Sequence, residues 1–248
     1  GVDSGCSNGA TGERGRRDAV AMCKQVAGAL GCATREVLPC STGVIGRHLE
    51  MGKLLPGIDA AAAKLARGKR ADGDTAMAIL TTDLVPKAAS RTVTLSGKRI
   101  TLGGVCKGSG MIAPNMATML AFITTDAAVA PDMLKAMLKE ATGGSFNRVT
   151  VDTDTSTSDS VIILANGAAG NRKITKPGKS SALMSRIATA FILMGCMPAA
   201  RAAARPRNTC GKSPPRVTFA KVASSKLSSE TFKLRRPAAA SGAANCSS

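Results

Sequence analysis

Apolar side chains recur along this chain at two different spacings, which predict both helices and strands. In residues 17–30 and 57–67 they return every three or four positions, the period of an amphipathic helix. Gly31 follows the first of these segments and is a typical helix stop. Pro131 opens a third helical segment, which ends near Gly143.

Short runs rich in β-branched and aliphatic residues lie between these helices and predict strands. Residues 91–104 have the pattern of a hairpin, with Ser96 and Gly97 at the turn. The other predicted strands cover residues 37–46, where a short strand runs into a glycine-rich turn, 76–81, 119–124, 146–152 and 160–166. The mixture of helices and strands predicts an α/β fold class.

The character of the chain changes after Gly170. Residues 171–248 hold 15 of the 34 Lys and Arg residues but one of the 16 acidic residues, Glu230. Residues 183–197 have helical spacing, and nothing after them organises around them. Two interpretations stay open: a disordered basic tail, or a segment from a different reading frame or an aberrant gene end. We therefore predict a folded core over 1–170 and a basic tail over 171–248.

The net charge of +18 at pH 7 suggests a nucleic-acid partner at first sight. The charge is concentrated in the tail, however, and the chain has five Phe and no Tyr or Trp on which bases could stack. Both observations argue against nucleic-acid binding. The longest apolar run, at 187–197, is too short to span a bilayer, so no membrane segment is expected.

Eight cysteines and a single histidine, His48, limit the metal and redox chemistry that this chain can perform. No two cysteines have the CxxC spacing of a zinc site, and we expect no bound metal. A disulfide framework is not expected in a chain of 248 residues, so free thiols in a reducing compartment are the simplest interpretation. The chain begins at Gly1 rather than Met, which leaves open a start or targeting segment upstream.

Three stretches carry candidate chemistry. The first is CSTGVIG at 40–46, where a strand followed by two glycines exposes backbone N–H groups that can hold an oxyanion. Its alternative is an ordinary turn.

The third stretch, further along the chain, is DTDTSTSDS at 152–160, which begins like a calcium loop. It lacks the Gly and Glu that an EF-hand needs, because Thr157 and Ile163 hold those positions. A polar connection between strands is the simpler interpretation.

The second stretch is KGSGMIAPNMATML at 107–120. It is not a phosphate loop, because Lys107 precedes the glycines instead of following them. A hydroxyl residue behind a small residue can attack the preceding carbonyl and shift the acyl group from nitrogen to oxygen. Hydrolysis would then give Thr118 its own α-amine, which has a pKa near ~8 and can act as general base for the hydroxyl. The alternative is a loop before a strand.

Together these stretches resemble the ornithine acetyltransferase / glutamate N-acetyltransferase family of the cyclic arginine pathway. The matching segments occur in family order, cover most of residues 8–170, and are most specific around KGSGMIAPNMATML. They are NGATGERGRRDA (8–19), VLPCSTGVIGRHLEMGKLLPGI (37–58), AILTTD (78–83), ITLGGVCKGSGMIAPNMATMLAFITTDA (100–127) and SFNRVTVDTDTSTSDSVIILANGAAG (145–170).

The resemblance implies a self-cleaving enzyme with layered sheets and helices. The precursor is cut between Ala117 and Thr118 into an α chain, 1–117, and a β chain that starts at 118, and these associate as α2β2. Thr118 is the nucleophile that takes the acetyl group, and it also contacts substrate. Thr42 and Gly43 match the oxyanion-hole positions.

The resemblance also implies two substrate-binding positions, Lys107 and Thr81. Each has a simpler alternative: Lys107 as a solvated loop lysine, and Thr81 as a cap at a strand end. The acetyl group passes from N-acetylornithine to glutamate, with no bound cofactor and with acetyl-CoA as a co-substrate of bifunctional members. The expected compartment is the cytoplasm, with the mitochondrial matrix as the alternative.

The family's β chain runs further and supplies a substrate-binding Glu, then an Asn and a Ser or Thr near its C-terminus. Residues 171–248 contain no recognisable counterparts, so we expect the C-terminal part of the family fold to be missing or replaced. The start of a normal family α chain is expected to be absent too. Two further interpretations therefore stay open: an inactive truncated pseudoenzyme, and a binding protein acting through its basic tail.

Overall fold

A computed structural model of the chain describes residues 1–66, 68–113, 119–156, 158–179, 181–182 and 185, and the strands Phe219–Lys221 and Ser228–Glu230. Its α-helices are α1 (Gly12–Leu30), α2 (Met51–Ala63), α3 (Lys69–Ala78) and α4 (Pro131–Gly143), and its 3-10 helices are η1 (Thr34–Glu36) and η2 (Phe146–Arg148). Its strands are β1 (Val2–Cys6), β2 (Cys40–Val44), β3 (Lys87–Leu95), β4 (Lys98–Lys107), β5 (Leu120–Thr125), β6 (Ser160–Ala165), β7 (Phe219–Lys221) and β8 (Ser228–Glu230). The fold class is α/β, as predicted.

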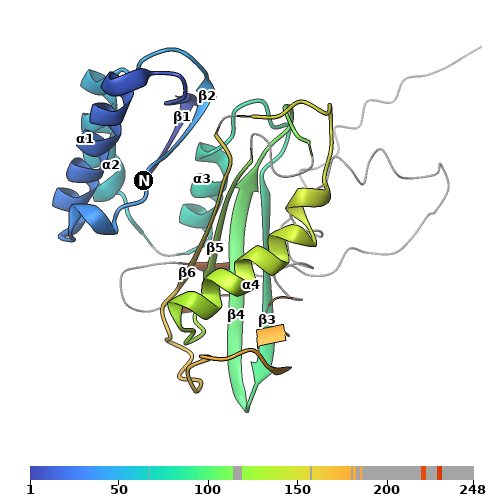
Figure 1. The fold of residues 1–248 in the computed structure, drawn as a ribbon. Helices are drawn as coiled ribbons and strands as arrows, with labels where there is room; N and C mark the ends of the chain where they lie inside the picture. The colour runs from blue at the N-terminus through green and yellow to red at the C-terminus, as the bar shows by residue number, and fades with distance from the viewer. Residues whose placement is uncertain are drawn as a thin grey trace, which may run out of the picture.

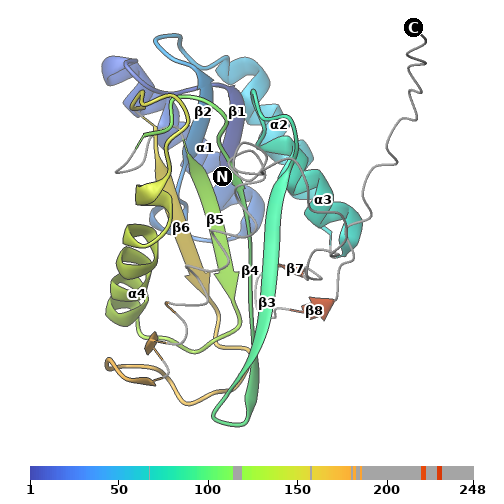
Figure 2. The same cartoon turned by 90° about the vertical axis from the view of Figure 1, so that its right-hand side faces the viewer.

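The largest sheet has the order β3-β4-β5-β6, and α4 lies along one of its faces (Figure 1). The first two pairings are antiparallel, and β5 and β6 run parallel. The main hydrophobic core lies between this sheet and α4, because Met137 and Ala141 of the helix pack with Ile100 and Ile123 of the strands. A second unit contains the parallel pair β1-β2 with α1 and α2 beside each other (Figures 1 and 2).

Several elements begin and end at the residues that the sequence singled out. Helix α1 ends at Leu30, and Gly31 adopts the left-handed conformation with φ of 67°. Helix α4 runs from Pro131 to Gly143, as predicted. Ser96 and Gly97 both have positive φ, which is the geometry of a type I′ turn between β3 and β4. The strands predicted at 119–124 and 160–166 are β5 and β6.

Two predicted strands are wrong. Residues 76–78 form the last turn of α3 and 79–81 lead out of it, and the burial of Ala76 and Ile79 beside an exposed Met77 is the pattern of a helix. Residues 146–152 begin with the 3-10 helix η2, which follows α4 and buries the side chain of Phe146 in the main core. The second helix starts at Met51 rather than at residue 57 and accommodates Pro56 in its interior.

Packed structure continues beyond Gly170, where we predicted the core to end. The side chain of Asn171 accepts the N–H of Ala128 at 2.8 Å and donates to its carbonyl at 3.2 Å. Ile174 exchanges two backbone hydrogen bonds with the loop before α4 and belongs to the main core. Most of the predicted tail, including most of the helical segment at 183–197, lies outside the described residues. Its disorder stays a prediction. Among the described residues no helix has both the length and the apolarity needed to cross a bilayer.

Candidate active site

The predicted cleavage point sits in the connection between β4 and β5. Ala117 and Thr118 belong to residues 114–118, which lie outside the described part of the chain. The residues on both sides are described, and the antiparallel register pairs Lys107, at the end of β4, with Leu120, at the start of β5. The two ends of the connection are therefore neighbours in the sheet.

Lys107 and Thr42 meet in the interior although 65 positions separate them in the sequence. Lys107 Nζ donates a hydrogen bond of 2.7 Å to Thr42 Oγ1, and each residue is 2% exposed. The alternative of a solvated loop lysine is therefore wrong. A buried ammonium beside a hydroxyl can hold an anionic group, so a substrate-binding Lys107 and an oxyanion-binding Thr42 are compatible with this geometry.

Gly43 is required by the packing of its own strand. Its φ is 133°, and a Cβ at this position would lie 2.3 Å from the carbonyl carbon of Gly5 in β1. Any larger side chain would therefore push β1 and β2 apart. This requirement is separate from the predicted oxyanion-hole role of Gly43, which stays a prediction.

Thr81 is exposed in the loop between α3 and β3. The alternative that it caps a strand end is wrong, because the preceding element is the helix α3. Its neighbour Asp83 instead turns inward, and the side chain of Asp83 has no exposed surface. Asp83 Oδ1 accepts the N–H of Gly108 at 2.8 Å and forms an ion pair with Lys87, which is also buried.

The charges of this cluster shift the pKa values of its members. Burial lowers the pKa of Lys107; the negative charge of Asp83 opposes that shift, and the positive charge of Lys87 adds to it. Burial alone would raise the pKa of Asp83, but the hydrogen bonds from Lys87 and from the Gly108 N–H outweigh it and leave that pKa lowered. The cluster therefore favours an ionised carboxylate and makes the Lys107 cation less stable than in water.

Two aspartates of the polar segment 152–160 bind the β4–β5 connection, one before and one after residues 114–118. Asp152 accepts the N–H groups of Met111 and Ile112 at 2.6 and 2.9 Å, and these bonds lower its pKa. Asp159 Oδ1 accepts the N–H of Met119 at 2.6 Å. Burial raises the pKa of Asp159, against the opposing effect of that N–H and of the Lys107 charge. We define Asp152 and Asp159 as the carboxylate clamp.

Sequence reasoning missed the carboxylate clamp and the Asp83–Lys87 pair. It compared only the D-x-D start of 152–160, Asp152 and Asp154, with a calcium loop, and it treated Asp83 only as the end of a motif. A signal was present: Asp159 stands next to the start of a predicted strand, where a carboxylate can accept the N–H groups of a neighbouring strand end. In the described part of the chain no group of three or more His, Cys, Asp or Glu residues is arranged to hold a metal.

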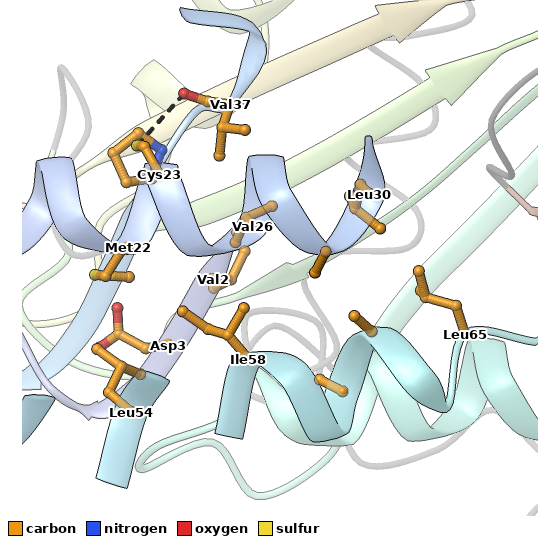
Figure 3. Close-up of a pocket in the computed structure, with 15 residues that line it drawn as sticks. Val2, Asp3, Met22, Cys23, Val26, Leu30, Val37, Leu54, Ile58 and Leu65 are labelled. Carbon is orange, nitrogen blue, oxygen red and sulfur yellow. Dashed lines mark hydrogen bonds between the residues drawn. The ribbon is translucent and has the colours of Figure 1, made fainter. Parts of the chain in front are cut away.

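An apolar hollow of about 210 Å³ lies elsewhere, between α1, α2 and the start of β1 (Figure 3). Met22, Val26 and Leu30 of α1 face Leu54 and Ile58 of α2 across it. The described residues that line it include none of the predicted site residues. The hollow therefore belongs to the packing of the two helices, and the candidate site is the cluster around Lys107.

Comparison with known proteins agrees with the motifs. The ArgJ family profile matches residues 2–193. An arginine biosynthesis bifunctional protein ArgJ from Symbiobacterium thermophilum is 50% identical over 179 residues, which are 72% of this chain and 44% of that protein. A mitochondrial ArgJ from Aspergillus clavatus is 46% identical over 194 residues, 77% of this chain and 43% of that protein. The chain thus spans less than half the length of these relatives.

The crystal structure of ArgJ from Bacillus halodurans is 41% identical to this chain, with a TM-score of 0.43 over 47% of this chain and 60% of that one. The family match includes the segments that supply Thr42, Asp83, Lys107 and Asp159, and it extends past Gly170. On the length of that match, the chain belongs to the ArgJ family.

Proposed function

We propose that this chain is an acetyltransferase of arginine biosynthesis that cuts itself between Ala117 and Thr118 and then uses Thr118 as its nucleophile. The observation that carries the proposal is the buried hydrogen bond from Lys107 to Thr42, next to Asp159, whose charge acts on Lys107 and whose carboxylate holds the N–H of Met119, the residue directly after Thr118. Membership of the ArgJ family and the relatives' names support the same activity.

The sheet explains how the two fragments would stay together. The cut falls in the connection between β4 and β5, which are antiparallel neighbours paired from Leu102–Thr125 to Lys107–Leu120. Cleavage of the connection leaves that ladder intact, so fragment 1–117 remains hydrogen-bonded to the fragment that starts at 118. Assembly of two such pairs as α2β2 is part of the proposal.

The transfer would proceed in two steps. The α-amine of Thr118 takes the proton of its own hydroxyl, and the oxygen attacks the acetyl carbon of N-acetylornithine, which releases ornithine and leaves an acetyl ester on Thr118. The amine of glutamate then attacks that ester, which gives N-acetylglutamate and restores the hydroxyl. Thr42 and the backbone N–H of Gly43 would stabilise the oxyanion of both steps. Acetyl-CoA would serve as an alternative donor.

The buried ammonium of Lys107 suits a carboxylate-bearing substrate. Ornithine and glutamate derivatives both carry such a group, so one lysine can serve both half-reactions. Thr81 is the second substrate position of the proposal. For the compartment we propose the cytoplasm, and the mitochondrial matrix is the alternative that the Aspergillus clavatus relative supports.

Intact-mass measurement of the full chain and two variants tests the proposal. We expect the wild-type chain to give two fragments split after Ala117, Thr118→Ser to give the same fragments more slowly, and Thr118→Ala to stay whole. A Thr118→Ala chain that still splits after Ala117 would reject self-cleavage. A wild-type chain that splits but forms no N-acetylglutamate from N-acetylornithine and glutamate would reject the transferase and leave a self-cleaving pseudoenzyme.

A further inference from the structure

The ion pair between Asp83 and Lys87 is buried beside the candidate site. The Asp83 side chain has no exposed surface and that of Lys87 is 6% exposed. Removing two charges from water has a free-energy cost that their mutual attraction often only balances, so a buried pair is weak evidence for a stabilising role. A more direct explanation of the pair is the stretch of backbone that it holds in place.

The pair is fixed to the backbone next to Lys107. The β3–β4 register sets Lys87 opposite Cys106, one residue before Lys107. Asp83 Oδ1, which binds Lys87, also accepts the N–H of Gly108, one residue after Lys107. The pair thus contacts the chain on both sides of Lys107, at the point where β4 ends.

The direction of the backbone at this point decides where Lys107 points. Gly108 has a φ of 153°, a conformation that side chains disfavour, and its N–H is turned toward Asp83. With the backbone held in this way, Lys107 Nζ reaches Thr42 Oγ1 at 2.7 Å. Loss of the Asp83 contact would free the turn and lengthen that hydrogen bond.

The two members of the pair also act on the charge of Lys107 in opposite directions. Asp83 stabilises the Lys107 cation and Lys87 destabilises it. Asp159 is the other charged group that faces Lys107, and it favours the cation. The remaining oxygen of Asp83, Oδ2, is buried and has no hydrogen-bond partner among the described residues. Asp83 therefore favours the charged form of Lys107.

We propose that Asp83 and Lys87 are positioning residues for Lys107, which hold the turn at the end of β4 so that the Lys107 amine faces Thr42. The inference rests on the proposed function for the task of Lys107, but the positioning itself is independent of catalysis. Neither residue is assigned to substrate contact.

The test measures the titration of the Lys107 amine in the 248-residue chain. Lysine labelled with 13C at Cε reports the titration of each amine, and the Lys107 signal is identified by its loss in Lys107→Arg. Asp83→Asn keeps an oxygen that can accept the Gly108 N–H and removes the charge. Lys87→Met keeps the length of the side chain and removes the opposite charge. We expect the titration midpoint of Lys107 to fall in Asp83→Asn and to rise in Lys87→Met.

A role in general stability alone would move both midpoints in the same direction or leave both unchanged, and either result would overturn the proposal. The double variant Asp83→Asn/Lys87→Met buries no unpaired charge and guards against a single variant that does not fold. Its midpoint should lie between those of the single variants. Hydrogen exchange adds a geometric readout: the Gly108 amide should exchange faster in Asp83→Ala and not in Asp83→Asn. Failure of Thr118→Ala to block cleavage would reject the proposed function without moving any of these values.

Discussion

Asp159 Oδ1 accepts the backbone N–H of Met119 over 2.6 Å, so a side chain 40 positions away holds the residue directly after Thr118. The backbone N–H of Ser160 reinforces this contact by donating to the Met119 carbonyl at 2.9 Å. Met119 itself is 3% exposed. The residue that follows Thr118 is therefore buried and hydrogen-bonded through both its N–H and its carbonyl.

The carboxylate clamp predicts a slow self-cleavage in Asp159→Ala. An attacking hydroxyl must be held within a fraction of an ångström of its line of approach, and misplacement by about 1 Å costs roughly 100-fold in rate. We expect cleavage of Asp159→Ala to be about 10- to 100-fold slower than that of the wild-type chain, followed by intact mass against time after synthesis. Asp159→Asn, which keeps an acceptor oxygen, should cleave faster than Asp159→Ala.

Asp154→Ala is the matched control for that experiment. Asp154 is an exposed aspartate of the same segment, and its backbone N–H, not its carboxylate, contacts Asp152. Its removal changes the net charge equally and should leave the cleavage rate unchanged. Equal rates in Asp159→Ala and the wild-type chain would mean that the clamp has no part in cleavage.

Lys107→Ala is expected to impair substrate use far more than folding. The ammonium is buried and hydrogen-bonded to Thr42, and the loss of a buried cation that binds a carboxylate costs about 2–5 kcal/mol of binding. We expect kcat/KM for N-acetylornithine to fall by about 30-fold or more, measured by steady-state kinetics. Lys98→Ala is the control, because Lys98 stands exposed at the other end of β4. An unchanged kcat/KM in Lys107→Ala would exclude a binding role.

Gly43→Ala is expected to destabilise the fold severely. The new methyl group would overlap the backbone of Gly5, and the residue would also have to adopt a positive φ. Together these effects should cost roughly 3 kcal/mol or more in the free energy of unfolding, measured with urea. Gly46→Ala separates the two effects: Gly46 has a φ of 80° but no atom within 4 Å of an added Cβ, so about 1–2 kcal/mol is expected. Equal losses in the two variants would show that the overlap at Gly43 relaxes.

The lowered pKa of Asp83 predicts a specific pH dependence of stability. Its folded-state pKa lies below the unfolded-state value, so the native state holds this proton more weakly. The carboxylate therefore contributes its full stabilisation above its ordinary pKa near ~4, and that contribution is lost as the pH falls through the lowered value. The difference in Tm between the wild-type chain and Asp83→Asn should be largest near neutral pH and should narrow in acid.

Thermal unfolding between about pH 2 and pH 7 checks this expectation around the ordinary aspartate pKa. Asp74→Asn is the control, because Asp74 is an aspartate of α3 with 74% of its side chain exposed, and its Tm difference should stay near zero at every pH. A gap between the wild-type chain and Asp83→Asn that is constant down to the lowest pH would contradict the charged role of Asp83.

The sequence alone determined the elements whose ends depend on one or two residues. Gly31 ends α1 and Pro131 starts α4, because each residue's backbone preference acts locally. Ser96 and Gly97 specify the β3–β4 turn for the same reason. The motif at 107–120 and its family resemblance, now supported by the family match, also came from the sequence by itself.

Only the tertiary structure decided which side chains meet. The segment at 76–81 begins with the end of a helix rather than forming a strand, because a short apolar run fits either state until its neighbours select the buried face. Asp159 reaches Met119 because β5 and β6 pair in one sheet, whereas Lys107 of β4 reaches Thr42 of β2 between two different sheets. No local spacing encodes either contact. The burial that lowers the pKa of Lys107 arises in the same way, since it depends on everything packed around the end of β4.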